Sequence, residues 1–74
     1  MNQIIIGRFI AELRKNKGLT QQELAQKLYV DRTTVSKWEV GKNSISIENL
    51  LQLTSIFDVS IDELIFGQEF QNKK

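Results

Sequence analysis

The chain has 74 residues, of which 41% are hydrophobic, and this size supports one small domain around a single core. It contains no cysteine and no histidine, which excludes disulfides, thiol catalysis and the usual zinc sites, so we expect no cofactor and no enzymatic activity. The net charge of +1 hides an asymmetry, because residues 1–45 carry eight Lys or Arg and four acids, whereas residues 46–74 carry two and five. The N-terminal part is therefore the natural side to face phosphates.

The chain has no proline and only four glycines, which favours helices joined by short bends. We expect an all-α fold of five helices. The longest apolar run, residues 4–6, is far too short to cross a bilayer, so we expect a cytoplasmic protein with no membrane partner.

The first predicted helix carries Ile6, Phe9, Ile10 and Leu13 at the i, i+3, i+4 and i+7 spacing of a buried stripe. Gly18 follows as its end signal. Such stripes pack against other helices far more often than they form cofactor sites.

The second predicted helix begins after Thr20, because Thr20 and Glu23 have the spacing of a capping box. Leu24, Ala25 and Leu28 then share one face, and Ala25 is small enough for another helix to cross closely. This helix is predicted to end near Leu28.

The third predicted helix runs from about residue 32 to residue 40, with the carboxylate of Asp31 as its expected cap and Gly41 as its stop. At about 100° per residue, Val35 and Trp38 share one side. The opposite side carries side chains that hydrogen-bond base edges or phosphates: Arg32, Thr33, Ser36 and Lys37. This pattern predicts that the partner is double-stranded DNA, although any one of these residues alone fits an ordinary solvated helix face.

Two further helices are expected to close the core. Ser46 caps the first, whose predicted stripe is Ile47, Leu50, Thr54 and Phe57. Ser60 and Glu63 form a second capping box before Leu64 and Ile65.

The stretch LTQQELAQKLYVDRTTVSKWEVGK, residues 19–42, resembles the helix-turn-helix of the lambda-repressor-like family, the Cro and XRE type of regulator. The resemblance extends through IGRFIAELRKNKG before it and IENLLQLTSIFDVSIDELI after it. It implies a compact five-helix DNA-binding domain over residues 1–67, with a helix-turn-helix formed by helices 2 and 3. Residues 68–74 are left as a polar C-terminal tail.

The resemblance also implies roles for individual residues. The residues that it implies contact base edges are Arg32, Thr33, Ser36 and Lys37, with Ser36 between base and phosphate. The residues that it implies contact phosphates are Gln21, Lys42 and Asn43. It also implies a partly buried ion pair between Arg14 and Glu39, with separately solvated charges as the alternative.

Four positions depart from the family pattern or stay ambiguous. Tyr29 stands in the bend where Gly is frequent, so a left-handed backbone there would carry a modest steric cost. Val40 replaces a residue that is often polar, so no phosphate contact is assigned to it. Phe9 and Ile56 fit either the edge of the core or an exposed contact.

The leading functional hypothesis is a bacterial or phage repressor that binds a pseudo-palindromic operator as a homodimer. The candidate dimer surface is apolar and lies toward the C-terminus: Leu53, Ile56, Ile65, Phe66 and Phe70. The alternative is an antitoxin-like or adaptor protein of the same fold whose protein partner contacts the acidic C-terminal half.

Overall fold

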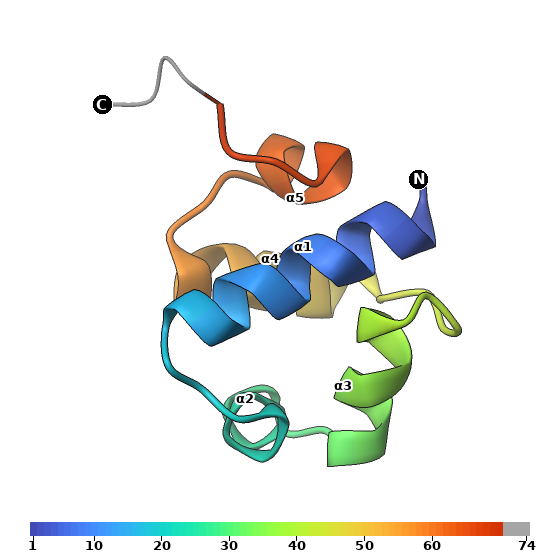
Figure 1. Cartoon of the computed structure of the whole chain (residues 1–74), viewed down its shortest axis with the longest axis vertical. Helices are drawn as coiled ribbons and strands as arrows, with labels where there is room; N and C mark the ends of the chain where they lie inside the picture. Colours follow the sequence, from blue (N-terminus) through green and yellow to red (C-terminus); the bar gives the residue numbers. More distant parts are fainter. Residues whose placement is uncertain (71–74) are drawn as a thin grey trace.

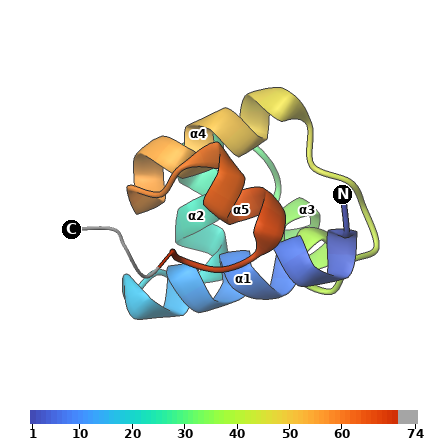
Figure 2. The same cartoon turned by 90° about the horizontal axis from the view of Figure 1, so that it is seen from above.

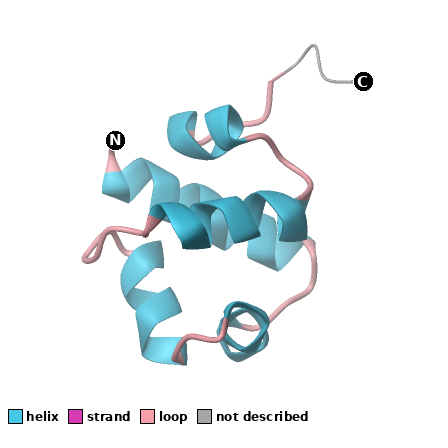
Figure 3. Cartoon of the chain, turned by 180° about the vertical axis from the view of Figure 1, so that it is seen from behind, coloured by secondary structure: helices cyan, strands magenta, loops and turns pink. Residues whose placement is uncertain are grey.

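The computed structural model describes residues 1–70, which form five helices and no strand (Figure 3). The helices are α1 (Gln3–Asn16), α2 (Gln21–Leu28), α3 (Arg32–Glu39), α4 (Ile47–Phe57) and α5 (Ile61–Phe66). The predicted all-α, five-helix architecture is confirmed. No helix in this part of the chain combines the length and the apolar character needed to cross a bilayer.

Helix α1 lies in the middle of the molecule and contacts both α3 and α5 (Figure 1). Helices α2 and α3 pack against each other on one side of α1, and α5 lies on the other side. Seen from above, α5 lies between α1 and α4 and contacts both, while α2 and α3 lie behind them (Figure 2).

Side-chain caps define most of the helix starts. Thr20 Oγ1 accepts from the Glu23 amide at 3.0 Å, and Glu23 Oε1 accepts from the Thr20 amide at 2.8 Å, so the predicted capping box of α2 is present. The box of Ser60 and Glu63 is present at the start of α5 as well. These reciprocal bonds satisfy amides that have no partner within the helix.

The prediction that the carboxylate of Asp31 caps α3 was wrong. Asp31 occupies the N-cap position of α3, but its side chain makes no capping hydrogen bond. The exposed carboxylate keeps its hydration and still complements the positive end of the helix dipole without direct contact.

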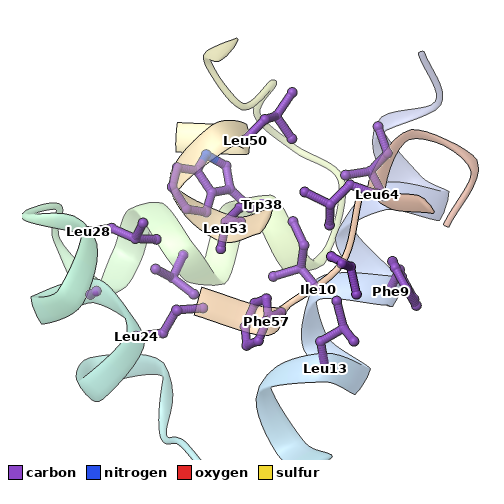
Figure 4. Packing of buried hydrophobic residues seen from close by; sticks show 14 residues of the cluster. Phe9, Ile10, Leu13, Leu24, Leu28, Trp38, Leu50, Leu53, Phe57 and Leu64 are labelled. Atoms are coloured by element: carbon purple, nitrogen blue, oxygen red, sulfur yellow. The ribbon is translucent and has the colours of Figure 1, made fainter. Parts of the chain in front are cut away.

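The core gathers buried side chains from all five helices and from the α4–α5 turn (Figure 4). Phe9 belongs to this core, which resolves its ambiguity, and Ile56 packs against the core's edge. The core consists of Ile6, Phe9, Ile10, Leu13, Leu24, Ala25, Leu28, Val35, Trp38, Leu50, Leu53, Phe57, Val59 and Leu64.

Two expectations about α4 were wrong. Leu53 is fully buried and cannot belong to a dimer surface, whereas Ile47, expected in the buried stripe, is 61% exposed. The reason is the helix register: Leu50, Leu53 and Phe57 form the inward stripe, and Ile47, the first residue of α4, lies beyond the core.

Tyr29 ends α2 in the left-handed conformation, with φ of 59°, and its side chain is 92% exposed. Its amide and that of Val30 close the last turn of α2 by donating to the carbonyls of Gln26 and Ala25. The bend between α2 and α3 is therefore a helix C-cap built on a residue with a Cβ, where glycine would be unstrained.

Candidate nucleic-acid interface

Helix α3 has one buried face and one open face. Val35 and Trp38 are buried in the core, while Arg32, Thr33 and Lys37 are exposed on the other side. Ser36, the fourth residue assigned to bases, is half-buried. The buried pair fixes the rotation of α3 about its axis, so the polar residues are presented outward as a group.

A Schellman motif ends α3 and directs the chain that follows. The Gly41 amide donates to the Trp38 carbonyl at 3.0 Å, and the Lys42 amide donates to the Lys37 carbonyl at 2.9 Å. Gly41 has φ of 77°, and a Cβ there would crowd Ile4 of α1. Lys42 and Asn43 are exposed just beyond this motif, at the C-terminal end of α3.

The loop after α3 is also tied to α1. Gln3 Nε2 donates a hydrogen bond to Ser44 Oγ across the gap between α1 and this loop. A cavity of about 200 Å³ lies beside this contact, lined by the start of α1, residues 43–45 and Leu50. The backbone at Lys42 and Asn43 is thus held by the Schellman motif before it and by the Gln3–Ser44 hydrogen bond after it.

Arg14 of α1 and Glu39 of α3 form a largely buried ion pair. Arg14 Nε lies 2.6 Å from Glu39 Oε2, and Arg14 Nη2 donates to Glu39 Oε1 at 3.1 Å. The third nitrogen, Nη1, donates to the Leu19 carbonyl at 2.8 Å. Hydrogen bonding to Glu39 raises the pKa of Arg14, opposed by burial and reinforced by the carboxylate's charge.

Gln21, assigned to phosphate, is half-buried and joins this ion pair to α3. Its Nε2 donates to Glu39 Oε1 at 2.9 Å, and its Oε1 accepts from Arg32 Nη1 at 3.3 Å. Both ends of the Gln21 amide therefore have protein partners. The second hydrogen of Nε2 is not used by either bond.

Sequence reasoning missed Gly7, which lies buried in α1 against the last turn of α3. A Cβ atom on Gly7 would overlap the carbonyl oxygen of Trp38 and come within 3.0 Å of its carbonyl carbon. The signal was present in the sequence, since an isolated glycine inside a helical pattern often marks a close approach of backbones.

The described residues offer no group of three or more acidic side chains, histidines or cysteines placed to hold a metal ion. The polar surface of α3 instead combines cations and hydroxyls, and the side-chain amides of Gln21 in α2 and Asn43 in the following loop lie at its two ends. These are the donors and acceptors that proteins use on nucleic-acid phosphates and base edges.

Comparison with known proteins agrees with this arrangement. A helix-turn-helix family model matches residues 10–64. The HTH-type transcriptional activator BcrR of Enterococcus faecalis is 48% identical over 60 residues, which cover 81% of this chain and 29% of that protein.

Two solved structures extend the likeness. The restriction-modification controller protein C.AhdI from Aeromonas hydrophila is 35% identical, with a TM-score of 0.76 over 85% of this chain and 91% of that one. The DNA-binding domain of the P22 C2 repressor is 30% identical, with a TM-score of 0.81 over 99% and 96% of the two chains.

Proposed function

The chain belongs to the helix-turn-helix family of transcriptional regulators, and we propose that it binds operator DNA sequence-specifically through α3. The observation that carries the proposal is the division of α3, whose Val35 and Trp38 are buried while Arg32, Thr33 and Lys37 are exposed. An α-helix fits the major groove, where these side chain types recognise base edges.

The proposed DNA contacts fall into two groups, those to base edges and those to phosphates. Arg32, Thr33 and Lys37 read bases, with Arg32 suited to the O6 and N7 acceptors of guanine, and Ser36 lies between base and phosphate. Gln21 at the start of α2 and Lys42 with Asn43 beyond α3 bind phosphates on either side of the groove. Residues 1–67 form the unit that does this.

We propose that two copies act together, because a few base contacts rarely distinguish one genomic site from the rest. A twofold arrangement places the two α3 helices about 34 Å apart and selects a pseudo-palindrome. With Leu53 removed from the predicted surface, the exposed Phe66 is its central residue, flanked by the half-buried Ile56, Ile65 and Phe70.

The regulatory outcome we propose is repression in the cytoplasm of a bacterium, with the operator overlapping the promoter so that the bound protein excludes polymerase. The P22 C2 protein is named a repressor, which supports this choice, whereas BcrR is named an activator. Repression and activation can be distinguished with a reporter gene. The operator, identified by the duplex selection described below, is placed either across the promoter or upstream of it. Repression only in the overlapping position is expected, and activation from the upstream position would contradict it.

Selection of duplexes from a random DNA pool tests the function itself. We expect the purified protein to recover one motif with twofold symmetry and to bind it with a steep salt dependence. Recovery of no motif, or salt-independent binding, would contradict sequence-specific recognition and would instead favour a protein partner on the acidic C-terminal half.

A further inference from the structure

We propose that Glu63 is a positioning residue for the dimer surface, because its buried carboxylate holds residues 67–70 as a strap along α1 and thereby sets Phe70 beside Phe66. The inference rests on the proposed association of two copies through this surface. It adds a residue that does not itself reach the partner, since Glu63 is only 2% exposed. The evidence is a set of contacts that starts within α5 and ends at Phe70.

The two carboxylate oxygens of Glu63 bind different parts of the chain. Oε1 accepts from the Ser60 amide at 2.9 Å, which is the capping bond of α5, and Oε2 accepts from the Phe70 amide at 2.9 Å. A buried carboxylate is unfavourable unless hydrogen bonds replace its hydration, and amide donors to a carboxylate form stronger bonds than neutral pairs do. The capping box uses Oε1, whereas Oε2 joins α5 to the end of the strap.

The strap leaves α5 through a turn that packs against α1. Gly67 has φ of 74°, and the amides of Gly67 and Gln68 donate to the Glu63 carbonyl at 2.8 and 3.1 Å. A Cβ on Gly67 would overlap the side chain of Ile5, so the backbone of the turn lies directly on α1. Glu63 therefore holds the strap at both ends, with its carbonyl at the start and its carboxylate at Phe70.

Between these two ends the strap follows α1. Gly67 borders a shallow hollow that Phe9 also lines, and Glu69 borders a second hollow beside Asn16 and Lys17. Figure 2 shows the chain after α5 running alongside α1 toward the C-terminal end of that helix. The strap thus begins where the proposed DNA-binding unit of residues 1–67 ends, and it adds to the surface on the side of α1 that carries α5.

The strap determines where Phe70 lies. Helix α5 ends at Phe66, so the helical period does not place Phe70 beside it. The two rings nevertheless pack together, with centroids 6.3 Å apart and planes tilted by 51°, which is typical of interacting aromatic pairs. Phe66 is exposed and Phe70 half-buried. An aromatic pair that is already assembled loses less conformational entropy on association than two independent rings, and such anchors dominate interface energies.

Glu63→Gln tests the strap without removing the cap. Glutamine can continue the capping box with its one acceptor oxygen, but its NH₂ group cannot accept from the Phe70 amide. We expect this variant to weaken self-association about tenfold, measured by sedimentation. Ser60→Ala is the matched control, because it removes the other half of the box and leaves the Glu63 carboxylate in place. Its dissociation constant should stay near the wild-type value.

A double-mutant cycle with Phe70→Ala separates positioning from a general loss of stability. If Glu63 acts through Phe70, Glu63→Gln should have little further effect on the dissociation constant once Phe70 is alanine. Additive effects in the double variant, or equal weakening by Ser60→Ala and Glu63→Gln, would overturn the inference and leave Glu63 as a cap of α5.

A measurement on the monomer tests the strap separately from the proposed dimer. At concentrations where the wild type is monomeric, the Phe70 amide should exchange with solvent at least about tenfold more slowly than in an unstructured chain, and Glu63→Gln should abolish this protection. Exchange at the unstructured rate in the wild type would overturn the inference even if the protein dimerises. A protected Phe70 amide in a chain that stays monomeric on operator DNA would contradict the proposed dimer, and with it the role of Glu63 there.

Discussion

Gly7 in α1 lies directly against the Trp38 carbonyl at the end of α3, so closely that a side chain on Gly7 would overlap that oxygen. This contact sets how near the last turn of the proposed reading helix comes to α1, because backbone meets backbone and no rotamer change can relieve a clash. The same Trp38 carbonyl accepts from the Gly41 amide in the turn that ends α3. One glycine thus supports both the position of α3 and the start of the following loop.

Gly7→Ala should therefore destabilise the protein by about 2 kcal/mol, even though alanine favours a helix interior over glycine. Urea denaturation gives the value. Gly18→Ala is the control, since Gly18 has φ of 73° and open space around it, so only backbone strain of about 1 kcal/mol applies. Gly7→Ala stability equal to wild type would contradict the close approach.

The Arg14 and Glu39 ion pair should behave as a unit. Arg14→Met or Glu39→Met alone should each cost about 3 kcal/mol, because the remaining charge stays in a poorly hydrated place. The double variant should cost clearly less than the sum of the two. A double-mutant cycle by urea denaturation measures this coupling, and simple additivity would indicate that the pair does not interact in solution.

Tyr29→Gly should stabilise the protein by about 0.5–1 kcal/mol, because glycine adopts the left-handed conformation of this bend without a Cβ penalty. The tyrosine side chain is almost fully exposed, so little packing is lost with it. Tyr29→Ala keeps the Cβ and should show no such gain in thermal or urea denaturation. A gain of equal size in both variants would point to the ring as the cause of the strain.

Lys42→Ala should weaken binding to all duplexes and flatten the dependence of log affinity on log salt by about one unit. Titrations at several salt concentrations measure the slope. Arg8→Ala is matched in charge but lies beside Ile5 and Gly67, on the α5 side of α1, so its slope should stay near the wild-type value. Equal slopes for Lys42→Ala and wild type would remove Lys42 from the phosphate contacts.

Phe66→Glu should weaken self-association about tenfold or more, because it places a charge at the centre of the proposed dimer surface. Sedimentation with and without operator DNA follows the change in mass. Leu51→Glu tests an exposed apolar side chain of α4 outside that surface and should have little effect. Loss of the dimer in Leu51→Glu, with Phe66→Glu unaffected, would move the interface to α4.

The helices and most of their caps were predictable because their determinants are close together in the chain. Thr20 with Glu23, and Ser60 with Glu63, are separated by three residues, and both capping boxes form as predicted. The stripe of α1 follows from one helical period in the same way. The errors at Ile47 and Leu53 arose where two rotations of α4 fit nearly the same apolar pattern, and contacts with other helices decide between them.

The sequence by itself determined the five helices, the polar and apolar sides of α3 and the residue types available to DNA, since short-range periodicity and capping dictate these. Only the tertiary structure decided that Gly7 packs against the last turn of α3, and that the Gln21 side chain forms hydrogen bonds with both Glu39 and Arg32. These relationships join residues 11 to 31 positions apart, and they depend on how the helices cross. Helix crossing is set by packing of the whole core, which no local pattern specifies.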